Sequence, residues 1–255
     1  MFRVLKLKLR ESLERGADPT TKAWWENYVK GSAPFMGVGM SAVRRALHQW
    51  HKAEIEGRLE YPAQMELALS LFDELYTEQK LAGILFLREI LVPAGVINYK
   101  RDIIRFAELF TDGRIHDWNV CDWFCVKVLG PLIGDNGFDC ARRIAQWRKA
   151  ENIWQARACL VPFVTVADNN LYYPTIEDSC RVLIRREERF AKTAVGWILR
   201  DVSKHDKSFV KRLIEDNIRH FSAESLGNAT KYFEKDERNQ FRKMRHRPKV
   251  KAMGD

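Results

Sequence analysis

The chain has 255 residues, of which 46% are hydrophobic and 11% aromatic, with only 14 Gly and 8 Pro. This composition excludes an intrinsically disordered protein, and the scarcity of turn-forming residues favours helices. No apolar run approaches the roughly 18 residues of a membrane span, and residues 1–16 alternate Leu with Lys or Arg where a signal peptide would be continuously apolar. We therefore expect no membrane partner and an intracellular location: the cytoplasm, on the nucleoid if the source is bacterial, or the nucleus if it is eukaryotic.

The net charge of +9 is unevenly distributed along the chain. Six basic residues and no acid lie within residues 242–251, and removing these six charges from +9 leaves +3 for the rest. Such runs are usually solvated arms that attract phosphate without specificity. We predict one folded domain over residues 1–235 and a basic, disordered tail over residues 236–255.

Apolar residues recur at i, i+3, i+4 and i+7 along most of the chain, which is the pattern of amphipathic helices. Short polar breaks such as "GDNG" (134–137) separate these stretches, and no stretch shows a convincing β-type alternation. The sequence therefore predicts an all-α protein of roughly a dozen helices. The clearest predicted helical stretches, in chain order, are 62–76, 79–91, 117–128, 153–164, 189–200 and 207–221.

The cysteine pattern favours core packing over chemistry. The five cysteines lie inside apolar helical stretches, without a CxxC motif and without His at ligand spacing. Cys121 and Cys125 share a helix face, but two thiolates lack the further ligands that zinc needs. We expect reduced core cysteines and no metal site.

A repeat relates the longer helical stretches. Trp118, Trp154 and Phe190 occupy matching places in "DWNVCDWFCVKV", "IWQARACLVPFV" and "RFAKTAVGWILR", and successive members are 36 residues apart. A helix pair fills a period of this length, which indicates an α-solenoid (an α-α superhelix of HEAT-like repeats) whose units bury their apolar faces by stacking. The concave face of such a stack binds extended partners.

Asp122 breaks the rule of this repeat. The positions 36 and 72 residues later are Ala158 and Ala194, which suit close helix packing. A carboxylate in apolar surroundings is costly unless it is paired, hydrogen-bonded or beside water. We therefore expect the face with Asp122 to line the concave groove, with Trp118 one turn away on the same face.

Arg157 and Trp197 have two interpretations each. Arg157 stands where the neighbouring repeats have Cys121 and Thr193, so it is either a groove residue or a structural ion-pair partner of Asp122 on an adjacent helix. Trp197 is either a groove residue or a large core residue, as most helical tryptophans are.

Four segments resemble, in order, motifs of the HEAT-like-repeat DNA alkylation repair glycosylases, the AlkD-like family. They are "YVKGSAPFMGV" (28–38), "DWNVCDWF" (117–124), "ENIWQARAC" (151–159) and "KTAVGWILRD" (192–201), and the resemblance extends from about residue 20 to about residue 235. The "GSAPF" stretch departs from the family's aromatic-rich linker, and the basic tail has no counterpart in it.

The resemblance implies a monofunctional glycosylase that hydrolyses the N-glycosidic bond of N3- or N7-alkylated purines in double-stranded DNA. Asp122 would be the catalytic carboxylate, with Trp118, Trp197 and Arg157 beside it. Tyr28 and Lys30, together with Arg157, would contact DNA. No cofactor or metal is implied, and a monomer is expected. The alternative is a non-catalytic HEAT-repeat module that binds DNA or a protein, because solenoids are often scaffolds.

Overall fold

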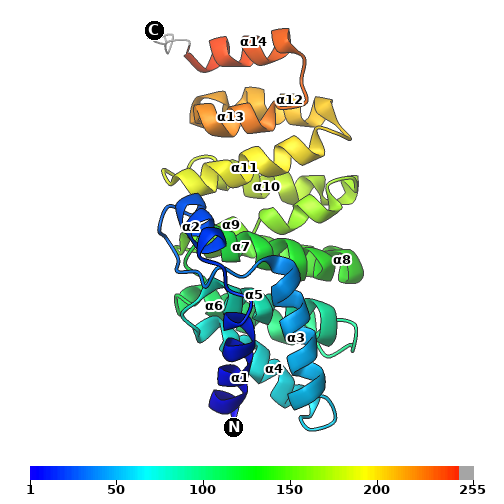
Figure 1. Ribbon diagram of the computed structural model, residues 1–255. Helices are drawn as coiled ribbons and strands as arrows, with labels where there is room; N and C mark the ends of the chain where they lie inside the picture. Colours follow the sequence, from blue (N-terminus) through cyan, green and yellow to red (C-terminus); the bar gives the residue numbers. More distant parts are fainter. Residues whose placement is uncertain (247–255) are drawn as a thin grey trace, which may run out of the picture. The chain divides into compact units, whose positions relative to one another are not determined.

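The computed structural model describes residues 1–246, and this part of the chain is helical without a β-strand, which confirms the all-α class (Figure 1). The chain divides into two compact units, residues 1–132 and residues 133–255. The single domain expected over residues 1–235 stays a prediction. The helices of the first unit are α1 Phe2–Glu14, α2 Pro19–Tyr28, α3 Met40–Glu54, α4 Tyr61–Ser70, α5 Thr77–Phe86, α6 Tyr99–Thr111 and α7 Trp118–Phe124.

The helix α8, Gly130–Ala145, begins at the end of the first unit and continues into the second, with a kink at Gly137 (φ 68°). The further helices of the second unit are α9 Ile153–Ala158, α10 Tyr173–Leu183, α11 Arg189–Val202, α12 Lys207–Asn217, α13 Ala223–Ala229 and α14 Lys235–His246. Short 3-10 and π segments join or extend several helices: Leu71–Asp73, Leu87–Leu91, Cys125–Leu129, Gln146–Lys149, Val161–Val166, Asn170–Tyr172 and Ile218–His220.

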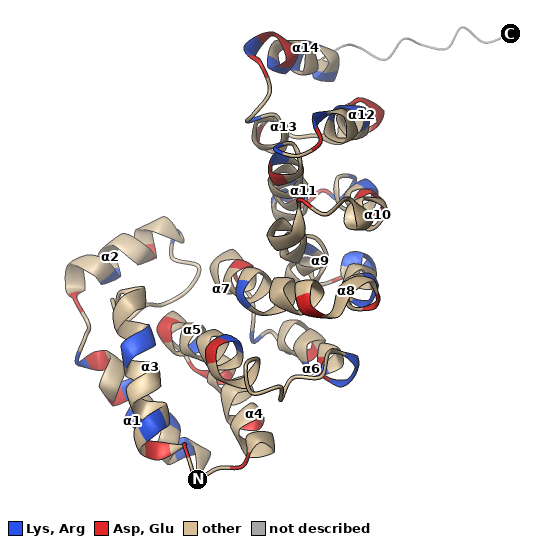
Figure 2. Ribbon diagram, turned by 90° about the vertical axis from the view of Figure 1, so that its right-hand side faces the viewer, with Lys and Arg blue, Asp and Glu red and all other residues tan. Residues whose placement is uncertain are grey.

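Within each unit, alternate helices stack in chain order. In the first unit α1 packs on α3, α3 on α5 and α5 on α7, while in the second α9 packs on α11 and α11 on α13. The even-numbered α4, α10 and α12 pack beside this row (Figures 1 and 2). This is the stacking of an α-solenoid, in which each helix pair buries its apolar side on the next pair.

The 36-residue period is visible as contacts between matching residues of α9 and α11. The ring centroids of Trp154 and Phe190 are 4.9 Å apart. Arg157 donates a hydrogen bond from Nη1 to Oγ1 of Thr193, which is 36 residues later, at 3.2 Å. The period predicted from the sequence is therefore confirmed for this pair of helices.

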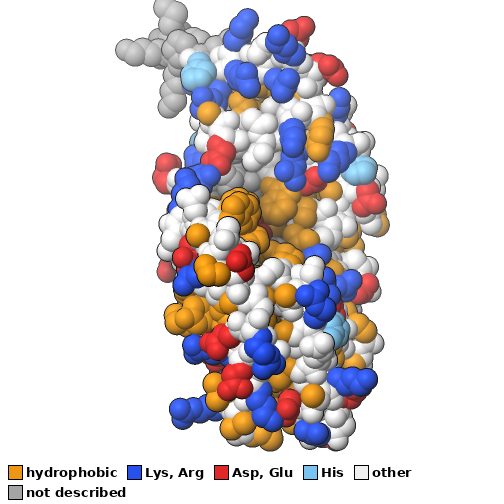
Figure 3. Space-filling model, viewed as in Figure 1, with side chains coloured by type: hydrophobic (Ala, Val, Ile, Leu, Met, Phe, Trp, Pro, Cys, Tyr) orange, Lys and Arg blue, Asp and Glu red, His pale blue; other side chains and the backbone are white. Residues whose placement is uncertain are grey.

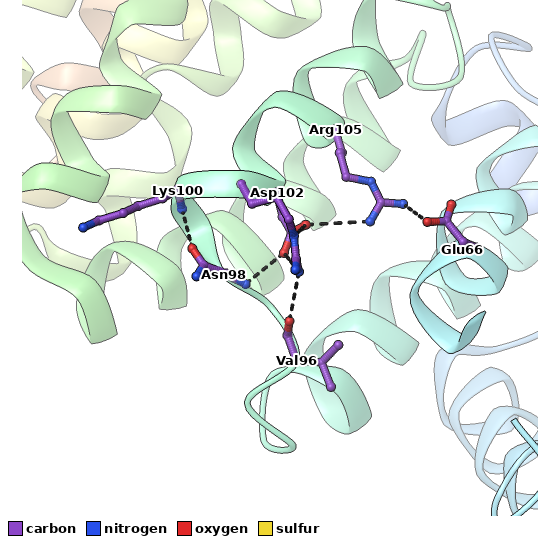
Figure 4. A network of polar contacts seen from close by, with 7 residues as sticks. Glu66, Val96, Asn98, Lys100, Asp102 and Arg105 are labelled. Carbon is purple, nitrogen blue, oxygen red and sulfur yellow. Dashed lines mark hydrogen bonds and ion pairs between the residues drawn. The ribbon is translucent and has the colours of Figure 1, made fainter. Parts of the chain in front are cut away.

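A network of charged groups fixes the start of α6 in the first unit (Figure 4). Asp102 is fully buried and accepts hydrogen bonds from the backbone N–H of Asn98 and from Nε and Nη2 of Arg101, each at 2.8 Å. Arg105 extends the network to Glu66 on α4 at 2.7 Å. These charge-assisted bonds offset the desolvation of the carboxylate.

The cysteines are core residues, as the sequence predicts. All five are buried. Burial raises the pKa of the Cys140 and Cys159 thiols to about 12. These two side chains therefore stay protonated at neutral pH and act as small hydrophobic groups.

The carboxyl-terminal segment differs from the expected disordered tail. Residues 235–246 form α14, whose Phe241 is buried and lies 5.8 Å from Phe233 between ring centroids. A single aromatic side chain thus docks an otherwise very polar helix onto the second unit, and α14 also packs on α13. The rest of the predicted tail, residues 247–255, lies outside the described residues. Among residues 1–246, no helix is both long enough and apolar enough to span a bilayer.

Candidate active site

Helix α7 carries Asp122 and Trp118 on one face. Asp117 caps the helix by accepting hydrogen bonds from the backbone N–H groups of Asn119 (2.8 Å) and Val120 (3.0 Å), so α7 begins at Trp118. Asp122 follows one turn later and is half-buried.

The repeat partners of Asp122 differ from it in exposure. Ala158 and Ala194 are both fully buried, at 0% exposure, whereas Asp122 retains part of its surface. The interpretation that Asp122 breaks the packing rule of its repeat therefore agrees with the structure. A carboxylate at this position keeps access to solvent.

A second acidic group lies at the start of the same helix. Asp117 is buried, and loss of hydration raises the pKa of its carboxyl despite the two backbone N–H groups and the nearby charge of Lys80. Burial conversely lowers the pKa of Lys80, whose Nζ donates to the backbone oxygen of Arg114 at 2.6 Å. The side chain of Asp117 is therefore committed to the cap of α7.

Aromatic side chains connect α2 to α7. The Tyr28 and Trp118 rings meet edge to face with centroids 5.2 Å apart. Tyr28 also stacks on Trp24 at 5.2 Å, and Trp25 stacks on Phe35 at 5.6 Å. Tyr28 remains 51% exposed and Trp24 58% exposed, so this aromatic surface beside the half-buried Trp118 is open to solvent.

Glu78 holds the turn that follows α2, a role that the sequence analysis missed. Its carboxylate, only 1% exposed, accepts hydrogen bonds from the backbone N–H groups of Met36 (2.9 Å), Gly37 (2.8 Å) and Val38 (3.0 Å). Gly37 has φ 97°, and a Cβ there would lie 2.3 Å from the backbone oxygen of Asp18. The turn in "PFMGV" therefore requires both a glycine and a distant carboxylate.

Lys30 ends α2 in a left-handed conformation with φ 54°, the sole non-glycine residue with positive φ in residues 1–246. Its N–H donates to the Asn27 oxygen at 3.1 Å, and the N–H of Gly31 donates to the Glu26 oxygen at 2.8 Å. This is the bonding of a Schellman cap, where glycine is usual. Since the Lys30 side chain is exposed, the strained position presents a cation to solvent.

Arg157 lies on α9 in the second unit, and only 5% of it is exposed. In addition to its bond to Thr193, its Nη1 donates to the backbone oxygen of Phe190 at 2.8 Å. Its guanidinium carbon lies 5.9 Å from the ring centroid of Trp197. Arg157 thus joins α9 to the first and third turns of α11.

Trp197 is placed by close packing of α11 on α13. A Cβ at the preceding Gly196 would lie 2.7 Å from the backbone oxygen of Ser225, so glycine lets the two helices approach. The guanidinium carbon of Arg200 lies 5.8 Å from the Trp197 centroid, and Arg200 pairs with Asp201 at 2.9 Å. Trp197 is half-buried, which is compatible with either a groove residue or a large core residue.

The structure therefore brings the sequence-predicted site residues together in two groups. Tyr28 contacts Trp118 in the first unit, where Asp122 and Lys30 also lie, and Arg157 contacts Trp197 in the second. Within residues 1–246, no cluster of three or more His, Cys, Asp or Glu side chains is arranged to hold a metal ion.

Comparison with known proteins assigns the family. The family model described as DNA alkylation repair enzyme matches residues 9–233, which include all the predicted site residues. The chain belongs to the DNA alkylation repair enzyme family. Membership in this DNA alkylation repair family places the protein in DNA repair, with DNA as its substrate.

A solved structure agrees with the fold. The predicted DNA alkylation repair enzyme from Enterococcus faecalis is 18% identical in sequence, with a TM-score of 0.69 over 86% of this chain and 97% of the other. At this identity the likeness concerns the fold. No match was found among curated proteins.

Proposed function

We propose that this DNA alkylation repair protein is a monofunctional glycosylase that releases N3- and N7-alkylated purines, such as 3-methyladenine and 7-methylguanine, from duplex DNA. The observation that carries the proposal is Asp122, a half-buried carboxylate one turn from Trp118, at a position where the repeats have buried alanine. The protein is proposed to act as a monomer and without a cofactor.

The proposed reaction is hydrolysis of the bond between C1′ of the deoxyribose and the purine nitrogen. Alkylation at N3 or N7 makes the purine a cation, so the electron pair of the breaking bond neutralises the leaving base. Water adds its oxygen to C1′ and gives up one proton, which leaves an abasic site. A strong general acid is unnecessary, because the base departs without being protonated first.

Asp122 has two roles in this reaction. The sugar acquires positive charge in the transition state, as in glycoside hydrolysis in general. The ionised carboxylate stabilises that charge and orients the attacking water. Selectivity follows from charge, because a neutral purine is a far poorer leaving group and a modest electrostatic contribution does not release it.

The aromatic residues contribute through their π faces. An indole attracts a nearby cation by about 0.5–2 kcal/mol, depending on how far both are desolvated. We propose that Trp118 and Trp197 interact through their π faces with the cationic base or with the positive charge that develops on the sugar. The guanidinium carbons of Arg157 and Arg200 lie 5.9 Å and 5.8 Å from the Trp197 ring centroid, so this ring already takes part in cation–π contacts. Tyr28 supports Trp118 by direct ring contact.

We propose that Arg157 is a positioning residue rather than a phosphate contact. The side chain is buried and its Nη1 is bonded to α11 through Phe190 and Thr193. A phosphate of DNA would have to reach a guanidinium that is 5% exposed. The planar group instead fixes α11, and therefore Trp197, relative to α9. Lys30, which is exposed, remains the proposed cationic DNA contact at the end of α2.

The test is release of 7-methylguanine and 3-methyladenine from methylated duplex DNA under single-turnover conditions. Asp122→Asn keeps the shape of the side chain and removes the charge, so we expect a large loss of rate with DNA binding retained. Glu108→Gln, at an exposed position on α6, is the matched control and should keep the wild-type rate.

Two results would count against the proposal. Equal rates for wild type and Asp122→Asn would remove Asp122 from the mechanism. DNA binding by wild type without release of any alkylated base would favour the non-catalytic binding module.

A further inference from the structure

Helix α14 lies beyond the part of the chain that matches the family. The family model ends at residue 233, and α14 begins at Lys235. Its first turn contains Asp236 and Glu237, but residues 238–246 contain three Arg, one Lys and one His and no acid. Figure 2 shows basic segments on α14, and in Figure 3 Lys and Arg side chains gather at the end of the second unit that carries it.

Docking of α14 on α13 creates a pocket of about 140 Å³. The wall from α13 is small and apolar, and at Gly227 an added Cβ would meet no atom within 4 Å, so the space above it is open. The wall from α14 is basic. The pocket is lined by Ala223, Leu226, Gly227, Arg242, Arg245 and His246.

The basic wall of this pocket has unused hydrogen-bond donors. The Nε of Arg245 is buried and has no hydrogen-bond partner among the described residues. Its Nη2 contacts Nε2 of His246 at 2.9 Å. The side chain of Arg242 is exposed, and the residues lining the pocket include no acid to balance the two guanidinium groups.

Two guanidinium groups without a carboxylate partner repel each other, and an anion between them removes this repulsion. Guanidinium also offers planar, paired N–H donors that match the oxygens of a phosphate. Two acids close in sequence to the pocket residues have partners elsewhere, because Glu224 pairs with Arg189 and Glu237 lies 3.9 Å from Lys211. The chemistry of the pocket therefore fits a phosphate group.

We propose that the pocket between α13 and α14 binds a phosphate of the DNA backbone, adding a contact that the family-matched part of the chain does not contain. This inference rests on the DNA-repair role of the family and is independent of the chemistry assigned to Asp122. The added contact strengthens binding to any duplex, damaged or not, because phosphates carry no sequence or lesion information.

The turn that joins α13 to α14, outside the pocket itself, also suits a nucleic-acid partner. Tyr232, just before α14, is 42% exposed, and the ammonium groups of Lys204 and Lys231 lie 5.3 Å and 5.9 Å from its ring centroid. Exposed aromatic rings interleaved with cations are typical of surfaces that follow a nucleic-acid backbone.

The experiment measures binding of the full-length chain to an unmodified fluorescent duplex by anisotropy over a series of salt concentrations. The variant Arg242→Gln/Arg245→Gln should bind on the order of tenfold more weakly at low salt. The slope of log K against log salt should flatten by about 0.9, as expected for one lost phosphate contact. Gly227→Leu fills the pocket without changing charge and should weaken binding in the same direction.

The matched control is Arg3→Gln/Arg45→Gln, which removes two charges from exposed positions of α1 and α3. It should keep the wild-type slope. The inference would be overturned if Arg242→Gln/Arg245→Gln or Gly227→Leu bound the duplex as tightly as the wild type. It would also be overturned if the control variant lost as much affinity as Arg242→Gln/Arg245→Gln. The duplex is undamaged, so this experiment measures DNA binding and does not depend on base release. If Asp122→Asn released bases at the wild-type rate, the proposed function would fail but this inference would stand.

Discussion

Replacing Glu78 by Gln tests whether the turn after α2 is held by a single carboxylate. In the wild type, Oε1 accepts from Gly37 and Val38 and Oε2 accepts from Met36. In the amide, the oxygen can still accept two of these bonds, but the NH2 group faces the third N–H donor. One buried N–H is left without an acceptor, and the other two bonds lose their charge assistance.

The expected loss of stability is substantial for the replacement of a single atom. A buried donor without a partner costs about 1–3 kcal/mol, and a charge-assisted bond is roughly twice as strong as a neutral one. We therefore expect Glu78→Gln to lower the free energy of unfolding by about 2–4 kcal/mol. Thermal unfolding followed by circular dichroism should show Tm falling by roughly 2–4 °C for each kcal/mol.

The same variant should also affect the site. The turn connects α2, which carries Tyr28, to α3, so loosening it weakens the contact between Tyr28 and Trp118. Base release should fall at temperatures where the variant is still folded, whereas Glu108→Gln should match the wild type in both assays. A free energy of unfolding within about 0.5 kcal/mol of wild type, the usual range for surface substitutions, would refute the reasoning.

Two further predictions concern ionisable groups of the second unit. Burial acts to raise the pKa of Asp201, but hydrogen bonds from Lys204 and Arg200 outweigh it and hold that pKa below its ordinary value. A carboxyl with a lowered folded-state pKa adds stability above its unfolded pKa of about 3.9 and loses it as the pH falls through the folded value. Asp201→Asn should therefore be less stable than wild type at pH 7 by on the order of 1 kcal/mol, which is measured as a lower Tm. The difference should shrink as the pH falls below about 4 and vanish only below the folded-state pKa; a gap that is independent of pH would contradict this. Burial raises the pKa of the Cys159 thiol to about 12, so Cys159 should resist iodoacetamide at pH 8 in the folded protein and react after denaturation in urea. Mass spectrometry of its peptide measures the labelling, and equal labelling in both states would count against a buried thiol.

The repeat was predictable because its signals are local. Helix periodicity is set within a few residues, and the 36-residue spacing of Trp154 and Phe190 is a recurrence of the same local pattern; matching positions of stacked repeats then contact each other. The exceptional character of Asp122 was predictable for the same reason, since it appears once Ala158 and Ala194 are aligned with it.

Two features of the structure were not predictable from the sequence. Glu78 accepts from residues about 40 positions earlier, and nothing in the local pattern of α5 separates it from an ordinary first-turn acid. Helix α14 has the composition of a charged tail, because Phe241 and Met244 are its only large apolar side chains and only Phe241 is buried.

The sequence by itself determined that the chain is a stack of helix pairs, and it marked the carboxylate of Asp122 as an exception to the packing of that stack. Only the tertiary structure decided that Tyr28 meets Trp118, that Glu78 closes the turn between α2 and α3, and that α14 docks to form a basic pocket. The physical reason is that periodicity and capping act over a few residues, whereas these contacts join segments distant along the chain or depend on one docked side chain.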